Sequence, residues 1–233
     1  MKRAQSTDQK PNRDETPVSR LNRLDACAVS DALDKLGLAG VVTGIHRLST
    51  DRKIAGRVLT VKLGLIQGPI NATRHLSTAA IEAAEPGDVI VVEQRTGVDA
   101  AAWGGVLSRG AKLRGVAGVI CEGPARDVDE SRQLDFPVFA RDHTSRTARG
   151  RIVEVGTNVP ILVGHVPVSP GDYVIADASA VVFVGQGEIA RVLEAAEAIA
   201  RREAAMVQAL ADGRRISEVM GASYEQMLEP HAK

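Results

Sequence analysis

The sequence predicts an α/β or α+β protein built as one domain. Segments with helical spacing of apolar residues alternate with short apolar runs of strand length, and the stretches between these runs can hold crossover helices. The chain has 233 residues, of which 44% are hydrophobic and 25% charged, as expected for a globular domain with a sizeable core. Because aromatic residues make up only 3%, that core must consist of Val, Ala, Leu and Ile.

The charge balance and the cysteines narrow the class of protein. Basic and acidic residues number 29 each, so the net charge supports neither a nucleic acid nor a membrane as a partner. Cys27 and Cys121 lack the spacing of a zinc or redox motif, and we expect both to be buried thiols. The sequence has no apolar run of transmembrane length and no apolar signal-peptide core, so we expect a cytoplasmic protein.

Local spacing and turn residues predict the individual elements. Residues 1–17 are polar and charged, and we expect a disordered tail before the domain of residues 18–233. Helical spacing predicts helices over residues 19–36, 71–84, 128–134, 188–211 and 216–228. Two or three strands are expected within residues 41–65, and apolar runs predict strands over residues 54–63, 89–92, 137–140, 151–155, 159–163, 173–176 and 181–184. The predicted helices carry Asp31 and His75, which helix packing or surface exposure explains most simply.

The rest of the chain is organised around residues 103–130. A helix is predicted to begin at the pair Gly104 and Gly105, where little side chain covers the first backbone N–H groups. These groups and the positive end of the helix dipole form a place for a carboxylate or phosphate. The apolar run of residues 115–121 predicts a buried strand, which returns the chain to the edge where the helix begins.

Three charged residues, Glu122, Arg126 and Asp127, stand at the exit of this predicted strand. An arginine can bind a carboxylate through two parallel hydrogen bonds, and a neighbouring aspartate can hold a hard divalent cation through oxygen. The stretch is therefore a candidate site for a small anionic substrate beside a metal ion. Simpler explanations remain open, because glycines also allow close helix packing and an Arg-Asp pair can be an ordinary surface ion pair.

With these residues the chain resembles the RraA-like proteins, which include 4-hydroxy-4-methyl-2-oxoglutarate aldolases and oxaloacetate decarboxylases. The resemblance covers residues 24–228 and is strongest at GVAGVICEGPARD, at GTNVPI and at the Pro-Gly-Asp turns of residues 86–88 and 170–172. It implies a swivelling β/β/α domain that assembles as a trimer or as a dimer of trimers.

The family's aldolase signature is an acidic residue, twenty further residues and then Arg-Asp. Here the acidic position is occupied by Gly105, so the acid that helps to order metal-bound water is missing. Three carboxylates could replace it, namely Asp99, Glu122 and Glu130. We expect Glu122 to do so, because it directly follows the predicted buried strand.

The resemblance also implies roles for the remaining residues. Arg126 would bind the pyruvoyl carboxylate of the substrate, and Asp127 would reach Mg²⁺ or Mn²⁺. The residues expected to contact the substrate at the helix start are Gly104, Gly105, Val106 and Leu107. The family also uses an acid from the last long helix of a neighbouring subunit, for which Glu203 is the candidate.

Two functions are consistent with the sequence. The first is a divalent-metal-dependent class II aldolase or decarboxylase, which cleaves a dicarboxylic 2-oxo acid and releases pyruvate. The second is a non-catalytic protein that inhibits a ribonuclease by binding it, as some family members do. The sequence leaves open which oxo acid would be cleaved, and whether by aldol cleavage or decarboxylation.

Overall fold

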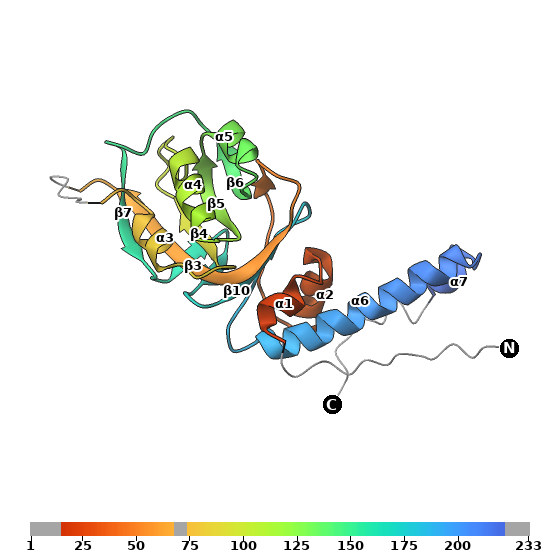
Figure 1. The fold of residues 1–233 in the computed structure, drawn as a ribbon. Coiled ribbons are helices and arrows are strands. Elements are labelled where there is room, and N and C mark those ends of the chain that lie inside the picture. The colour runs from red at the N-terminus through yellow and green to blue at the C-terminus, as the bar shows by residue number, and fades with distance from the viewer. Residues whose placement is uncertain (1–14, 68–73, 222–233) are drawn as a thin grey trace.

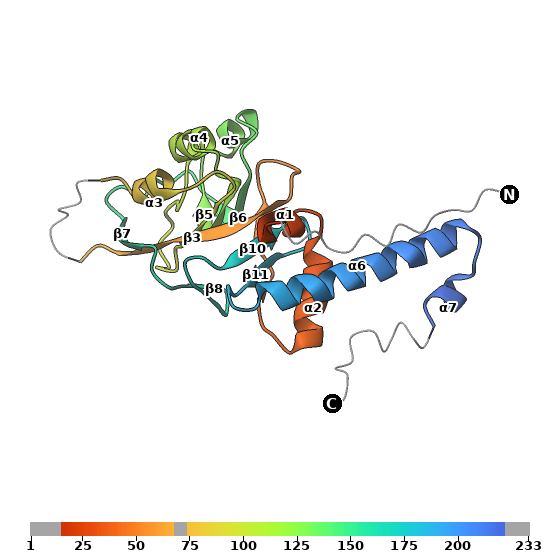
Figure 2. The same cartoon turned by 60° about the horizontal axis from the view of Figure 1, so that its bottom comes forward.

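The computed structural model describes residues 15–67 and 74–221 and contains a curled, mixed sheet with helices on its outer faces (Figure 1). Its centre consists of four parallel strands: β3 (Ile54–Leu65), β4 (Val89–Glu93), β5 (Gly118–Ala125) and β6 (Val138–His143). Three crossover helices connect them: α3 (Thr78–Ala83), α4 (Gly105–Leu113) and α5 (Val128–Gln133). These helices cover one face of the parallel strands (Figures 1 and 2).

The outer strands curl the sheet. Next to β3 come β10 (Tyr173–Ala176), β11 (Val181–Val184) and β1 (Val41–Val42), all antiparallel, while β2 (His46–Arg47) closes the other edge beside β6. The far end of the long strand β3 pairs with β7 (Ile152–Thr157), and β8 (Ile161–Val163) forms a hairpin with β9 (Val166–Val168). The inner face of the curled sheet and this hairpin enclose an aliphatic core with few aromatic residues. The result is an α/β fold whose sheet curls into a half-barrel; the sequence predicts the α/β class but not the half-barrel.

A second helical layer covers β10 and β11. It consists of α1 (Pro17–Leu21), α2 (Ala26–Leu36) and the first half of α6 (Ile189–Ala211). A two-point ion pair joins α1 to α6, with Nε of Arg20 2.7 Å and Nη2 2.9 Å from the carboxylate oxygens of Glu197. The distal half of α6 and the short helix α7 (Ile216–Val219) project away from the body (Figures 1 and 2). No helix in the described part of the chain has the length and apolar character needed to cross a membrane.

Several predicted elements need correction. The helix expected over residues 19–36 is broken, because the Asp25 carboxylate accepts a hydrogen bond from the Ala28 N–H at 2.8 Å and starts a new helix there. On this new helix Cys27 is exposed, so the prediction of a buried thiol was wrong for Cys27 and is confirmed only for Cys121. Burial raises the pKa of the Cys121 thiol.

The other differences lie at the ends of elements. The helix expected over residues 71–84 begins only at Thr78, which leaves His75 in a turn; residues 71–73 are outside the described part. Strand β9 was missed because Pro167 at its centre disfavours a strand, and β9 tolerates it because it pairs with β8 alone. The last predicted helix is represented by the four residues of α7, and residues 222–228 lie outside the described part.

Candidate active site

The candidate site lies where β4 and β5 end, at the carboxyl edge of the parallel strands. This is the edge at which open α/β sheets bind their ligands. Two backbone hydrogen bonds join the loops that follow these strands: Ala102 N–H donates to Pro124 O at 2.8 Å, and Arg126 N–H donates to Trp103 O at 2.9 Å. The start of α4 is thereby held against the segment that follows β5.

The N-terminus of α4 offers backbone donors to this site. Gly105 N–H donates to Oδ2 of Asp127 at 3.0 Å, so this aspartate already caps the helix. The next two donors, the N–H groups of Val106 and Leu107, have no acceptor among the residues that the structure describes. A Cβ on Gly104 would lie 2.9 Å from Oδ2 of Asp127, so a side chain there would crowd the carboxylate.

Arg126 and Asp127 form an ion pair at the mouth of the site. Nε of Arg126 lies 3.1 and 3.2 Å from the two carboxylate oxygens of Asp127, which fixes the side chain of the arginine. Its terminal amino groups make no hydrogen bond to any described residue and remain available for a ligand. Asp127 has a left-handed backbone, with φ of 55°, a conformation that is uncommon for non-glycine residues and occurs often at functional sites.

Glu130 occupies the place beside Gly105 where the family's acidic side chain would begin. A Cβ built on Gly105 would lie 2.0 Å from Oε2 and 2.4 Å from Cδ of Glu130, far closer than any real contact. Glu130 reaches this position because it is three residues beyond Asp127, almost one helical turn along α5. The carboxylates of Asp127 and Glu130 therefore flank Gly105.

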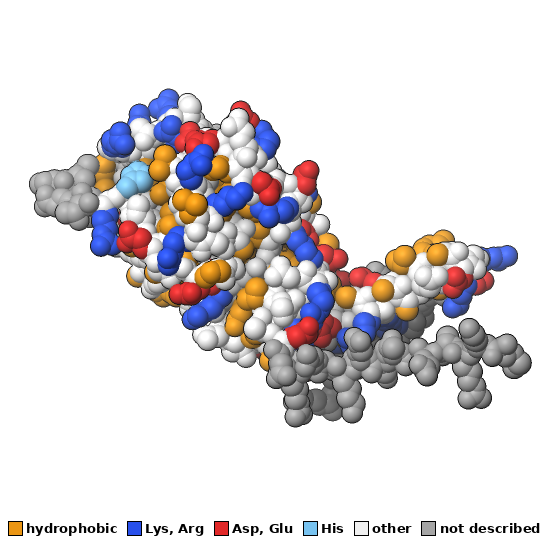
Figure 3. All heavy atoms as spheres, viewed as in Figure 1, with side chains coloured by type: hydrophobic (Ala, Val, Ile, Leu, Met, Phe, Trp, Pro, Cys, Tyr) orange, Lys and Arg blue, Asp and Glu red, His pale blue; other side chains and the backbone are white. Residues whose placement is uncertain are grey.

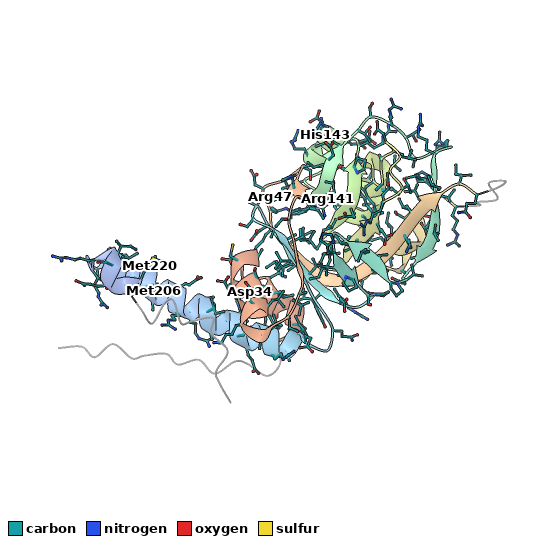
Figure 4. The ribbon with its side chains drawn as sticks, turned by 180° about the vertical axis from the view of Figure 1, so that it is seen from behind. Asp34, Arg47, Arg141, His143, Met206 and Met220 are labelled. Carbon is teal, nitrogen blue, oxygen red and sulfur yellow. The ribbon has the colours of Figure 1, made fainter. Side chains whose placement is uncertain are left out.

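Glu122, which we expected to replace the missing acid, is not brought to this site. Strand β5 continues to Ala125, so Glu122 lies within the strand, and the alternation of side chains turns it away from Cys121 and from α4. Its carboxylate accepts hydrogen bonds from Nε of Arg141 at 3.1 Å and from Nη2 at 2.9 Å. Figure 4 shows Arg141 on β6, behind the face that carries α4.

The other residues considered from the sequence are also placed elsewhere. Asp99 forms an ion pair with Arg146 at 2.9 Å. Glu203 lies half-buried on α6 and does not line the cavity of its own chain; burial, followed by the nearby charges of Asp31 and Asp25, raises its pKa.

A cavity of about 210 Å³ opens over the start of α4. Its lining includes every residue expected at the site except Glu122, together with residues from two other loops. The lining residues are His75, Leu76, Ala101, Trp103, Gly104, Gly105, Val106, Leu107, Arg126, Asp127, Thr147, Ala148 and Arg149. Thr147 and Arg149 were not predicted at the site, because they lie far along the chain in a loop without a recognisable motif.

A buried polar network supports the site from behind. Nε1 of Trp103 donates to Oγ of Ser108 at 2.9 Å, and this hydroxyl lies 2.9 Å from Oγ of Ser131 on α5. Both serines are fully buried. The network therefore joins α4 to α5 and fixes Gly105 relative to Glu130.

The residues at the site fit a hard divalent cation. In the described ranges, no group of three or more His, Cys, Asp or Glu side chains is placed to hold a metal ion. Asp127 and Glu130 supply carboxylate oxygens only, and Mg²⁺ is commonly held by one or two carboxylates with water and substrate completing its shell. Catalytic and structural zinc sites have three or four protein ligands, mostly His and Cys, whereas this site offers carboxylate oxygens alone, a donor set of the kind that Mg²⁺ and Mn²⁺ accept.

The fold and the site define an α/β protein in which a helix start with unpaired backbone N–H groups lies beside the carboxylates of Asp127 and Glu130. The sequence profile of the RraA-like family, described as Aldolase/RraA, matches residues 26–183. The chain belongs to this family.

Individual relatives agree with this assignment. A protein of Halalkalibacterium halodurans, provisionally named a 4-hydroxy-4-methyl-2-oxoglutarate aldolase, is 30% identical over 217 residues, which are 91% of this chain and 96% of that protein. The 4-hydroxy-4-methyl-2-oxoglutarate aldolase of Thermus thermophilus is 31% identical over 126 residues, 54% of this chain and 71% of that protein. The crystal structure of Streptomyces coelicolor RraAS2, a member of the RNase ES inhibitor RraA family, superposes with a TM-score of 0.73. The superposition covers 88% of this chain and 99% of RraAS2. At 24% sequence identity this similarity supports the fold alone.

Proposed function

We propose that this protein is a divalent-metal-dependent carbon–carbon lyase of the class II aldolase or decarboxylase type. Its substrate would be a dicarboxylic 2-oxo acid, of the 4-hydroxy-4-methyl-2-oxoglutarate or oxaloacetate kind, and its product pyruvate. The observation that carries the proposal is the convergence of three features at one cavity: a free arginine fork, unpaired helix N–H groups and the Asp127 carboxylate. The Glu130 carboxylate lies beside Gly105 at the edge of this site, although Glu130 is not among the residues that line the cavity. The aldolase names of the relatives support this reaction class.

The 2-oxo carboxylate of the substrate would bind to Arg126. The terminal amino groups of Arg126 can donate two parallel hydrogen bonds to a carboxylate, because Asp127 already holds Nε of this arginine. The unpaired N–H groups of Val106 and Leu107, at the positive end of the α4 dipole, would add donors for the same end of the substrate.

Asp127 and Glu130 would hold Mg²⁺ or Mn²⁺ and its water. When bound, such a cation stabilises the negative charge that develops on the ketone oxygen as the carbon–carbon bond breaks. Glu130 would replace the acidic residue that is missing at position 105, and its Oε atoms would hold or move a proton. Glu130, and not Glu122, is therefore our candidate for the third catalytic residue.

A lactate dehydrogenase-coupled pyruvate assay tests the proposal. Oxaloacetate and 4-hydroxy-4-methyl-2-oxoglutarate would be offered with Mg²⁺, with Mn²⁺ and after chelation. We expect pyruvate release that depends on the added cation. Arg126→Lys keeps the positive charge but loses the planar fork, so it should weaken substrate use about tenfold to a hundredfold with an unchanged melting temperature.

Full activity after chelation and dialysis would refute the metal-dependent mechanism. Inactivity on both acids with every cation would refute the lyase and favour the second candidate, a binding protein whose site has lost its acid at Gly105. Binding to a purified ribonuclease would then be the property to measure.

We further propose a homotrimer or a hexamer with the site near a subunit boundary. The distal end of α6 carries apolar side chains away from the body, where Val207 is 66% exposed and Ile216 of α7 is 56% exposed. Figure 4 shows Met206 and Met220 on the same projecting end. Light scattering coupled to size exclusion would give three or six times the chain mass, and a monomer with full activity would contradict the proposal.

A further inference from the structure

A second wall of the cavity carries positive charge that the proposed mechanism does not use. It is formed by the turn before α3, with His75 and Leu76, and by the loop between β6 and β7, with Ala148 and Arg149. The same four residues also line an adjoining cavity of about 200 Å³. They therefore stand at the junction between the candidate site and a second space into which a longer ligand can extend.

The loop that carries Arg149 is tied to the site. Thr144 N–H donates to Ala125 O at 2.9 Å, and Ala101 N–H donates to Arg146 O at 3.0 Å. The buried side chain of Ala148 anchors the loop in the core. The position of the Arg149 backbone is thus set by the same strand end, β5, that positions Arg126.

The turn that carries His75 is equally fixed. Leu76 is buried in the core, and the hydroxyl of Thr78 donates to the His75 carbonyl at 2.7 Å. Ser77 N–H donates to the Glu154 carboxylate at 2.5 Å, so this turn is fastened to β7.

The side chains of Arg149 and His75 at the junction have no acidic partner among the described residues. In the part of the chain that the structure describes, no carboxylate lies within ion-pair distance of the Arg149 guanidinium or the His75 imidazole. Glu154, the acid that lines the adjoining cavity, already accepts hydrogen bonds from Ser77 and Thr157. Figure 3 shows Lys and Arg side chains around a histidine at the end of the molecule that carries α3, α4 and β7.

We propose that Arg149 and His75 form a second anion subsite that binds the far carboxylate of the substrate. This inference rests on the proposed function, in which Arg126 binds the 2-oxo carboxylate at the other end of the same cavity. Arg149 would supply a planar two-point contact, and His75 would supply a ring N–H donor. The pair would make the site selective for dicarboxylic over monocarboxylic 2-oxo acids, and would release pyruvate readily because pyruvate lacks the second carboxylate.

The test compares two inert acids of equal chain length. 2-Oxopentanedioate and 2-oxopentanoate differ only in the far carboxylate, and neither carries the 4-hydroxyl group or the 3-carboxylate that the proposed cleavage needs. Their affinities for the full chain with Mg²⁺ would be measured by titration calorimetry. We expect the wild-type protein to prefer the dicarboxylate by about tenfold or more.

Three variants assign the preference to residues. Arg149→Gln should abolish most of it while leaving the affinity for 2-oxopentanoate unchanged, and His75→Gln should reduce it in part. Arg109→Gln is the matched control, because Arg109 is exposed on α4 but does not line the cavity, and it should keep the preference. All three side chains are exposed, so the melting temperature should stay unchanged.

The outcomes separate this proposal from the lyase proposal. Arg149-dependent preference in a protein that releases no pyruvate would support the subsite and refute the lyase. Pyruvate release without any preference between the two acids would refute the subsite alone. The subsite proposal would also be overturned if Arg149→Gln lowered the affinity for both acids equally. The same holds if Arg109→Gln reduced the preference for the dicarboxylate as much as Arg149→Gln does.

Discussion

Replacing Gly105 by Ala should remove activity with little effect on stability. The new Cβ would lie 2.0 Å from Oε2 and 2.4 Å from Cδ of Glu130, whereas ordinary contact begins at 3.4 Å. The Glu130 carboxylate must therefore move by more than an ångström, away from the position in which it flanks the site. Only the end of a flexible side chain has to move, so the fold itself should not be strained.

The effects of Gly105→Ala on stability and on activity should differ greatly in magnitude. Forcing Glu130 into a less favourable rotamer costs about 0.5–1.5 kcal/mol, and the alanine regains about 0.5–1 kcal/mol because glycine is the poorer helix residue. These terms nearly cancel, so the melting temperature should change by no more than a few degrees. Loss of a positioned proton-transfer group costs about a hundredfold to ten-thousandfold in rate. We therefore expect pyruvate release to fall at least about a hundredfold.

Gly110→Ala is the matched control on the same helix. Its Cβ would lie 3.8 Å from Cγ2 of Ile81, an ordinary contact, so this variant should keep full activity. In a Glu130→Gln background, Gly105→Ala should cost no further activity, because the group through which it acts is already gone. The coupled pyruvate assay with Mg²⁺ measures the wild-type protein and the four variants. Equal activity of the two alanine variants would refute the reasoning, as would an undiminished effect of Gly105→Ala in the Glu130→Gln background.

Three further predictions concern metal binding and pH. Asp127→Asn should weaken Mg²⁺ activation in the pyruvate assay by at least about tenfold with an unchanged melting temperature, and unaltered Mg²⁺ dependence would contradict the ligand assignment. Glu197→Gln should lower stability by about 2 kcal/mol at pH 7, because its hydrogen bonds with Arg20 lower the pKa of Glu197. That contribution is fully present above the unfolded pKa of about 4.3 and is lost as the pH falls through the lower folded pKa, so denaturant titrations of the two proteins should converge in acid. Asp31→Asn should act in the opposite direction, because burial and then the charge of Asp34 raise the pKa of Asp31; it should raise the melting temperature at pH 7, with a gain that disappears as the pH falls below the raised pKa.

The local features of the site were predictable from the sequence. The start of α4 at Gly104 and Gly105 follows from residues adjacent in the chain, as does the Arg126-Asp127 pair after a buried strand. The α/β class was predictable for the same reason, because alternating helix and strand periods are properties of short segments. The break at Asp25 was missed, since apolar spacing continues across the two helices and hides the cap.

The choice among the three candidate acids needed the tertiary structure. Strand β5 pairs with β4 through Glu122 and with β6 as far as Ala125, and this pairing keeps Glu122 inside the strand and facing away from α4. A shift of one residue along a strand moves a side chain to the opposite face, and the end of the apolar run did not predict where the pairing stops. The helical turn after Asp127 then brings Glu130 back to Gly105.

Sequence alone therefore determined most of the elements, the family resemblance and the residues on the chain segment around α4 and β5. The tertiary structure decided which of the three candidate acids lies beside Gly105 and which distant loops complete the cavity. His75 and Arg149 line the same cavity although they are remote in the chain, because the end of β3, which precedes His75, pairs with the start of β7, which follows Arg149. Short-range periodicity and capping depend on near neighbours, whereas the composition of a cavity depends on strand order and register, which no single segment encodes.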